Sequence, residues 1–175
     1  MAGGWRGRVQ GRPLRITIQP MDRYEHLRSR GLTLPPAPRP IASYRSYLLE
    51  SGLLYLSGQG PLRSDGRLCT GKVGVDVSIE EAYAHARLVG INLLAVMHEA
   101  LGDLGRVKRI VKLLGMVNAA SDFVDHPRVV NGCSDLFIDV FGHEDGGHAR
   151  SAIGVGSLPG NITVEIEAIV AVHGP

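Results

Sequence analysis

Cysteines, long apolar runs and aromatic side chains are all scarce in this chain of 175 residues. Its two cysteines, Cys69 and Cys133, form no CxxC pair, and two isolated thiols do not make a disulfide framework. No apolar run reaches the roughly 18 residues needed to cross a bilayer, and the N-terminus lacks a continuous apolar stretch of the secretory type. We therefore expect reduced thiols in a soluble, cytoplasmic protein that makes no contact with a membrane.

The motifs of several common active sites are also missing. Residues 66–73 nearly match a phosphate-binding loop, but Val73 stands where a Ser or Thr should reach magnesium. No histidine begins the H-x-E motif of zinc deaminases, and neither HExxH nor GxSxG occurs. The glycines at 154 and 156 lead into a predicted strand, whereas a dinucleotide fingerprint leads into a helix. These absences weigh against metal, nucleotide and serine-hydrolase chemistry, and we expect no metal and no organic cofactor.

Charge is distributed unevenly, although the formal net charge is only +2. Residues 1–45 hold nine arginines against Asp22 and Glu25, so the remainder of the chain is net negative. Frequent glycines near the N-terminus break any amphipathic targeting helix, which favours a solvated basic arm over a contact with nucleic acid or an acidic surface. We expect residues 1–40 to form this arm, a short helix at 21–30 and a Pro-rich linker, and to contribute little apolar surface to a core. One domain is expected at 41–175.

Apolar periodicity predicts the element order β-β-α-β-α-β-β. The capping-box pair Ser78 and Glu81 begins a helix that ends at Gly102, and Pro127 begins a second helix that Gly142 stops. Strands are expected at residues 44–50, 53–57, 107–117, 150–158 and 162–172, the first two joined by a tight turn at 51–52 and the last two by a hairpin turn at 159–160. The order predicts an α+β fold in which one mixed sheet carries both helices on one face. The other face then needs cover, which oligomerisation would supply.

Polar and apolar residues alternate along the last predicted strand. Thr163, Glu165 and Glu167 therefore share one face, opposite the purely apolar face that packs under the helices. If residues 150–158 and 162–172 form a hairpin, Arg150 lies near Glu165. A solvated strand face is the alternative explanation for either residue alone. Together, a fixed arginine beside a shielded carboxylate could bind a small acid and position a hydrolytic water.

Three segments of the sequence resemble hallmark stretches of the Rid (YjgF-like) family of imine and enamine deaminases. They are residues 55–61 (YLSGQGP), 149–151 (ARS) and 158–168 (LPGNITVEIEA), and the similarity runs from about residue 41 to the C-terminus. The resemblance implies a fold like that of chorismate mutase. It also implies a homotrimer whose sheets form a central barrel-like core, with substrate bound in clefts between subunits.

The resemblance also implies roles for individual residues. Arg150 matches the arginine that grips the substrate carboxylate, and Glu165 matches the glutamate that places the attacking water. Tyr44 lies where a family tyrosine closes the pocket from a neighbouring subunit. The further pocket positions are Ser57, Gly58, Asn131 and Ala152. Ala152 stands where the family often has a cysteine, whose usual contribution is a backbone contact.

The reaction implied is the metal-free hydrolytic deamination of 2-imino or enamine acids to 2-keto acids and ammonia. A non-catalytic trimer that binds small metabolites or a protein partner in the same clefts is the main alternative. Ribonuclease or translation-inhibitor activity is another. The net negative charge of residues 46–175 and the 5% aromatic content argue against a broad RNA surface. We therefore expect a small carboxylic-acid imine or enamine as the partner and no nucleic acid.

Overall fold

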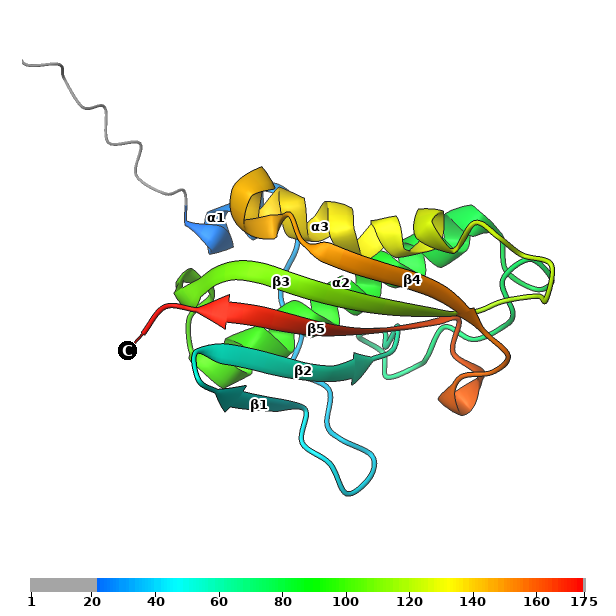
Figure 1. Ribbon diagram of the computed structural model, residues 1–175, viewed down its shortest axis with the longest axis horizontal. Coiled ribbons are helices and arrows are strands. Elements are labelled where there is room, and N and C mark those ends of the chain that lie inside the picture. Colours follow the sequence, from blue (N-terminus) through cyan, green and yellow to red (C-terminus); the bar gives the residue numbers. More distant parts are fainter. Residues whose placement is uncertain (1–21, 175) are drawn as a thin grey trace, which may run out of the picture.

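The computed structural model describes residues 22–174, and the greater part of the predicted basic arm lies outside the described residues. Strands and long helices follow one another in the predicted order β-β-α-β-α-β-β, preceded by one short helix (Figure 1). The elements are α1 (Arg23–Ser29), β1 (Tyr47–Glu50), β2 (Leu53–Gln59), α2 (Ile79–Leu101), the 3-10 turn η1 (Leu104–Arg106), β3 (Val107–Asn118), α3 (His126–Gly146), β4 (Ala149–Val155), the 3-10 turn η2 (Pro159–Asn161) and β5 (Val164–Val172). No helix within residues 22–174 combines the length and apolarity that a membrane span needs.

The five strands form one mixed sheet in the order β1-β2-β5-β3-β4. β4 pairs with β3 in parallel, and β5 lies between β2 and β3, antiparallel to both. The predicted hairpin between the last two strands is therefore wrong. The Pro159-Gly160 turn signal is real but belongs to η2, and residues 156–163 cross the end of β3 because two strand spacings, about 10 Å, separate β4 from β5.

Local sequence signals explain the remaining element boundaries. Ser51 and Gly52 both have positive φ angles, of 50° and 78°, which gives the two-residue turn expected between β1 and β2. At the start of α2, the Ser78 hydroxyl accepts from the Glu81 N–H and the Glu81 carboxylate accepts from the Ser78 N–H, so the predicted capping box is confirmed. Gly142, with φ of 80°, interrupts α3, although the helix resumes as far as Gly146.

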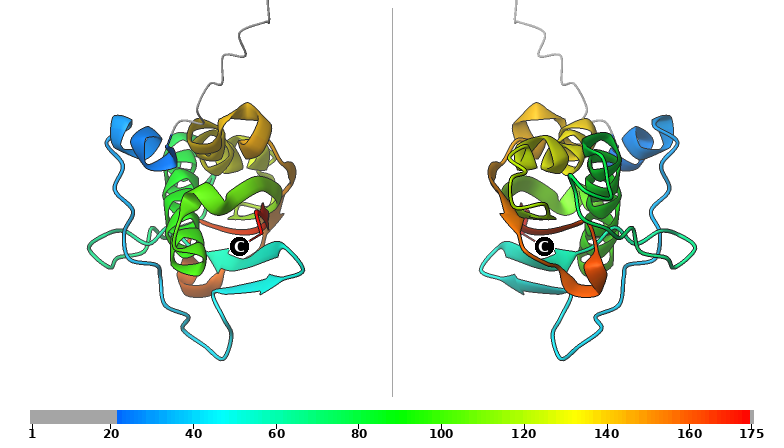
Figure 2. Two further views of the ribbon diagram at one scale, coloured as in Figure 1. Left: turned by 90° about the vertical axis from the view of Figure 1, so that its left-hand side faces the viewer. Right: turned by 90° about the vertical axis from the view of Figure 1, so that its right-hand side faces the viewer.

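Helices α2 and α3 cover the same face of the sheet, as predicted (Figure 2). They approach closely at Gly132 of α3, where the absence of a side chain makes the contact possible. A Cβ at that position would collide with the backbone of Tyr83 and Arg87 on α2. Between the helices and the sheet lies one continuous apolar core. Its largest fully buried members include Leu54, Leu93, Met97, Ile110, Leu113, Leu136, Phe137 and Ile166. Both cysteines are free and buried.

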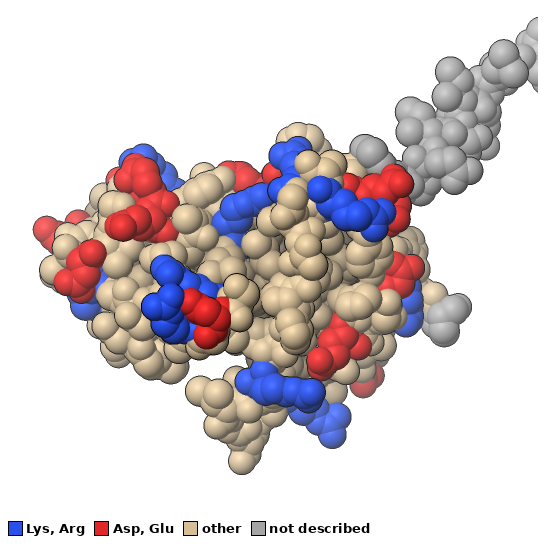
Figure 3. Space-filling model, turned by 180° about the vertical axis from the view of Figure 1, so that it is seen from behind, with Lys and Arg blue, Asp and Glu red and all other residues tan. Residues whose placement is uncertain are grey.

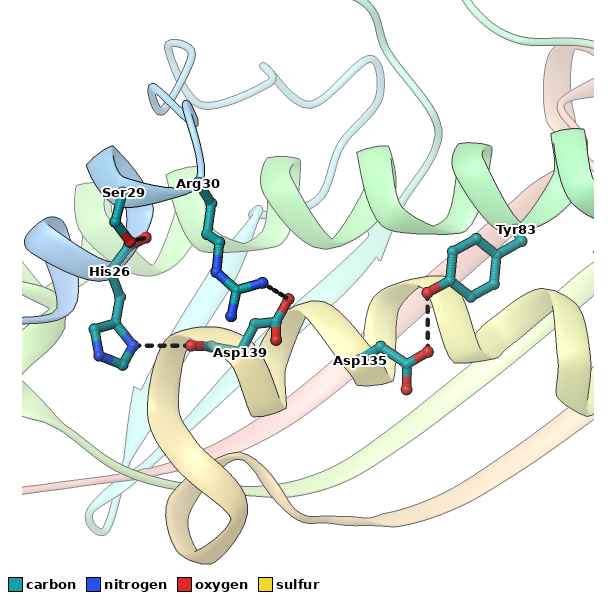
Figure 4. Close-up of polar contacts among 6 residues, drawn as sticks. All are labelled: His26, Ser29, Arg30, Tyr83, Asp135 and Asp139. Carbon is teal, nitrogen blue, oxygen red and sulfur yellow. Dashed lines mark hydrogen bonds and ion pairs between the residues drawn. The ribbon is translucent and has the colours of Figure 1, made fainter.

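Helix α1 belongs to this core, contrary to the expectation that residues 1–40 add little apolar surface. Leu27 is only 3% exposed and packs within the core cluster. The Arg23 guanidinium donates to the carbonyl oxygen of Phe141, just before the break in α3, and pairs with Asp145 at 2.9 Å. Figure 4 shows two further contacts, from His26 to the backbone oxygen of Asp139 and from Arg30 to its carboxylate. Helix α1 is short and precedes the first strand by many residues in the sequence. It therefore offered too few apolar positions for its packing to be predicted.

We expect Leu27→Ala to lower the free energy of unfolding by about 2–4 kcal/mol, the usual cost of a cavity at a fully buried leucine. Urea unfolding at fixed protein concentration measures this cost. Glu25→Ala, on the exposed side of the same helix, is the matched control and should change stability by less than about 0.5 kcal/mol. Equal midpoints for Leu27→Ala and the wild type would show that α1 does not stabilise the core.

Candidate functional site

Glu165 lies on β5, on the sheet face that the helices leave open. Its neighbours Val164 and Ile166 are fully buried on the helix side, so strand alternation turns the carboxylate to the other side. Pairing between β2 and β5 shifts register between Leu56 and Gln59, so that Ser57 and Gly58 of β2 together lie opposite the single residue Glu167 of β5. Gly58 lies in this bulge, and a Cβ there would collide with the Glu165 carboxylate. The glycine therefore makes room for the acid.

The protonation of Glu165 is shifted by its surroundings. Burial raises the pKa of the Glu165 carboxyl above its ordinary value, and the like charge of Glu167, two residues along the same strand face, raises it further. A carboxyl group with a raised pKa exchanges protons closer to neutral pH than a solvated glutamate does. Glu165 is therefore suited to accept a proton from water and to return it.

A pocket of about 300 Å³ opens in front of Glu165. Tyr44 and Gly58 line it beside the carboxylate, and Arg39 borders it from the Pro-rich segment. Its apolar walls comprise Pro38, Ile41, Leu62, Leu68, Pro159 and Ile162. We call this cavity the Glu165 pocket. It combines one acid with an apolar lining, the usual composition of a small-molecule site.

Arg150 lies on the edge strand β4 and points the opposite way, toward α3. Its Nη1 donates to Asn131 Oδ1 at 2.8 Å and to Ser134 Oγ at 2.9 Å, and its Nη2 contacts the carbonyl oxygen of Pro127 at 3.4 Å. Ala152, two residues along β4, packs against the core on the same side. We call these residues the Arg150 cluster. Asn131 and Arg150 were both predicted as site residues, and the structure brings them together.

Arg150 and Glu165 are not neighbours within one chain. Arg150 is paired across the sheet with Leu113 and Glu165 with Met116, so β3 runs between them and their side chains leave opposite faces. The predicted proximity of the two residues depended on the hairpin that the sheet order excludes. Thr163 is also corrected, because it is fully buried and its hydroxyl meets His85 Nδ1 on α2 at 3.2 Å. It does not share the face of Glu165.

Ser57, a further predicted site residue, precedes Gly58 in the β2 bulge. Its hydroxyl donates to the carbonyl oxygen of Arg45 at 2.7 Å, and it lines a neighbouring hollow together with Tyr55 and Glu167. Ser57 therefore lies next to the Glu165 pocket and holds the segment that carries Tyr44. The seven predicted site residues thus form two groups, with Tyr44, Ser57, Gly58 and Glu165 in one and Asn131, Arg150 and Ala152 in the other.

Two polar residues beside Arg150 were missed by the sequence analysis: Ser134, which belongs to the Arg150 cluster, and His148, which extends it. Ser134 Oγ meets His148 Nε2 at 2.9 Å, and His148 Nδ1 meets the carbonyl oxygen of Gly146 at 2.6 Å. Burial lowers the pKa of His148, the positive charge of Arg150 also lowers it, and the hydrogen bond to Gly146 acts in the opposite direction. Ser134 stands three residues after Asn131, on the same face of α3, and this spacing was the available signal. His148 had none.

Other candidate motifs do not form sites. Lys72, the lysine of the near-match to a phosphate loop, donates to Asn118 Oδ1, Ala119 O and Gly156 O, which uses all three of its ammonium hydrogens. It holds the loop that ends β3 against the connection that follows β4. Within residues 22–174, no three His, Cys, Asp or Glu side chains gather in a way that could hold a metal ion.

Comparison with known proteins places this geometry in a family. Residues 25–168 match the model of the family described as "YjgF/chorismate_mutase-like, putative endoribonuclease". Protein TCP17 of Trypanosoma cruzi is 41% identical over 148 residues, which cover 85% of this chain and 92% of that protein. A 2-iminobutanoate/2-iminopropanoate deaminase of Dermatophagoides farinae is 30% identical, with 81% of this chain and 95% of that protein covered.

Solved structures agree with the family match. The crystal structure of a protein of unknown function from Agrobacterium tumefaciens superimposes with a TM-score of 0.79 at 42% sequence identity, covering 86% of this chain and 94% of that one. The mixed five-stranded sheet with its helices on one face is the chorismate-mutase-like fold that the sequence motifs implied. The chain belongs to the YjgF-like, or Rid, family.

Proposed function

We propose that this protein hydrolyses 2-imino and enamine acids to 2-keto acids and ammonia, using a site shared between copies of the chain in a homotrimer and needing neither metal nor organic cofactor. The observation that carries the proposal is the Glu165 carboxylate, shielded in an apolar pocket and given room by Gly58. The deaminase of Dermatophagoides farinae, a relative at 30% identity, supports the choice of reaction.

The chemistry needs few groups, because the carbon of an imine is already electrophilic. Glu165 accepts a proton as water adds to that carbon, and the C=N bond becomes a C–N single bond in a tetrahedral carbinolamine. Glu165 returns this proton to the nitrogen, the C–N bond breaks with its electron pair leaving on ammonia, and the hydroxyl passes its proton to Glu165 as the C=O bond forms. Arg150 holds the substrate carboxylate throughout, which fixes the imine carbon relative to the water.

A second copy of the chain is required because Arg150 and Glu165 leave opposite faces of one sheet. The open face is apolar in part, with Leu48 at 51%, Tyr55 at 41% and Ile153 at 45% exposure. β4 is an edge strand, and unpaired edges and apolar faces are the surfaces that association covers. Packing such faces together in a closed ring would bring the Arg150 edge of one copy to the Glu165 pocket of the next. The site would then be complete only in the assembly.

The endoribonuclease in the family description receives less support. Figure 3 shows the helix-covered face, on which Lys and Arg are interspersed with Asp and Glu. Several of the arginines are paired with carboxylates, including Arg23 with Asp145 and Arg128 with Glu80. A surface that binds RNA broadly gathers positive charge on one face. Small-molecule chemistry in the Glu165 pocket therefore accounts better for the structure.

We expect Arg150→Ala and Glu165→Gln to fail in different ways. Removal of the guanidinium should abolish both the binding of a 2-keto acid product and turnover. Glu165→Gln keeps the shape but removes the base, so product binding should survive while turnover falls roughly 100-fold or more. Ammonia release from imines generated by an amino-acid oxidase, corrected for spontaneous hydrolysis, measures the rate, and calorimetry with the 2-keto acid measures binding. Each variant must elute with the wild type, and a Glu165→Gln variant that releases ammonia as fast as the wild type would show that Glu165 is not the base.

The pH profile should reflect the surroundings of Glu165. The base is active when ionised, so kcat/KM should fall as pH decreases through the raised pKa, and the acid limb should lie above the ordinary glutamate value of about 4.3. Glu167→Gln removes a like charge and should move this limb to lower pH. An acid limb that Glu167→Gln leaves in place would assign the titration to another group.

A raised pKa of Glu165 also means that the ionised carboxylate opposes folding at neutral pH, so Glu165→Gln should unfold no more easily than the wild type.

Gly58→Ala should reduce turnover severely, because the added methyl group occupies the position of the Glu165 carboxylate. We expect the rate to approach that of Glu165→Gln. Gly156→Ala is the matched control, since a Cβ at Gly156 meets no atom within 4 Å. The same ammonia assay compares the two variants. Full activity in Gly58→Ala would mean that the carboxylate does not act from the position it occupies here.

A further inference from the structure

One side of the Arg150 guanidinium group, the Nη1 side, is engaged in hydrogen bonds within the chain. Both hydrogens of Nη1 are directed at acceptors on α3, Asn131 Oδ1 and Ser134 Oγ. A guanidinium has five N–H donors, so the Nε and Nη2 side keeps its donors, apart from the 3.4 Å contact of Nη2 with Pro127 O. Nε and Nη2 together form a fork that matches a carboxylate. The two anchors on Nη1 therefore decide which way the fork points.

The hydroxyl of Ser134 accepts from Arg150 through an oxygen lone pair, and its own hydrogen remains available for another acceptor. That acceptor is His148 Nε2, at 2.9 Å. His148 Nδ1 faces the carbonyl oxygen of Gly146 at 2.6 Å, and a carbonyl can only accept, so Nδ1 carries the hydrogen. Nε2 of a neutral ring is then free to accept. One tautomer of a neutral His148 thus satisfies every group from Gly146 to Arg150.

The surroundings of His148 keep it neutral. The groups that α3 presents to the ring are the Ser134 hydroxyl, the Gly146 carbonyl oxygen and the edge of Phe137, and none of them is charged. Burial lowers the pKa of His148, and Arg150 on β4, a like charge to a protonated histidine, lowers it further, while the hydrogen bond to Gly146 acts in the opposite direction without reversing the shift. A protonated His148 would also turn an N–H toward Ser134 Oγ, in competition with Arg150.

We propose that Ser134 and His148 are positioning residues for Arg150: the imidazole orients the Ser134 hydroxyl, which fixes the Nη1 side of the guanidinium and turns the Nε–Nη2 fork toward the substrate carboxylate. This role rests on the proposed function for its substrate. It goes beyond that function because neither residue belongs to the set that the family motifs assign. His148 acts through Ser134 and touches no reacting atom.

Substitutions in the full-length protein separate positioning from general stability. Ser134→Ala and His148→Leu should each weaken the binding of 2-oxobutanoate about five- to tenfold and raise KM, with kcat nearly unchanged, because each frees one side of the guanidinium. Ser134→Thr and His148→Gln keep a hydroxyl and an acceptor near Nε2, and should restore most of the affinity. Asp135→Ala, next to Ser134 but directed at Tyr83 on α2, should bind 2-oxobutanoate as the wild type does (Figure 4).

The two proposals fail in distinguishable ways. A wild type that neither releases ammonia nor binds 2-oxobutanoate refutes the proposed function. A wild type that does both, with unchanged affinity in Ser134→Ala and His148→Leu, refutes the positioning role alone. Nitrogen NMR of the wild type decides the hydrogen-bond arrangement without any substrate, since it should show the Nδ1–H tautomer of His148 at neutral pH. An Nε2–H tautomer, or a protonated ring at pH 7, would overturn the inference.

Discussion

The antiparallel pairing of β5 with both β2 and β3 is the interaction on which the rest of the structure depends. Alternate side chains of a central strand point to opposite faces of the sheet. On β5 the side chains that point to the buried face are Val164, Ile166 and Val170. Core burial therefore fixes the opposite orientation of Glu165, since a slip of one residue would place its carboxylate under the helices. The central position of β5 also leaves β4 at the sheet edge. The two halves of the candidate site are separated by the same pairing that makes the core.

Glycine allows the backbone to approach the Glu165 carboxylate closely, and this approach sets the surroundings of the carboxylate on the open face. The bulge in β2 brings backbone against the Glu165 carboxylate at Gly58, where a side chain would displace it. Backbone and apolar walls then replace part of the water around the acid, and this desolvation raises its pKa more than the neighbouring charge of Glu167 does. On the helix side, Gly132 brings α3 against α2, and α3 carries Asn131 and Ser134. Close backbone approach at these two glycines thus shapes both halves of the candidate site.

The sequence predicted what local patterns determine and missed what topology determines. Capping at Ser78, the turn at Ser51 and the alternation along β5 each depend on neighbouring residues. The first two were confirmed, and the alternation was confirmed for Glu165 and Glu167 but not for Thr163, which is buried on the helix side. The hairpin between the last strands was wrong because β3 and β4 pair through a helical crossover, which no local signal shows. The packing of Leu27 and the contact between His148 and Ser134 are likewise long-range or cross-element contacts. Motif resemblance identified the family and named the candidate site residues, but the sequence did not show that they fall into two groups that one chain keeps apart.

The orientation of the Arg150 side chain has to be set more strictly in a site divided between two faces of the sheet than in a pocket built within one chain. In the proposed homotrimer its guanidinium has to be fixed by its own subunit, because the substrate carboxylate would lie beside the Glu165 of another copy. Asn131 alone would leave the group free to rotate about one hydrogen bond, whereas a second anchor at Ser134 fixes the plane of the guanidinium. The arginine is then organised before association, so that docking of the subunits does not also have to order its side chain. The partly buried polar chain from Gly146 to Arg150 provides that order at the edge of the sheet.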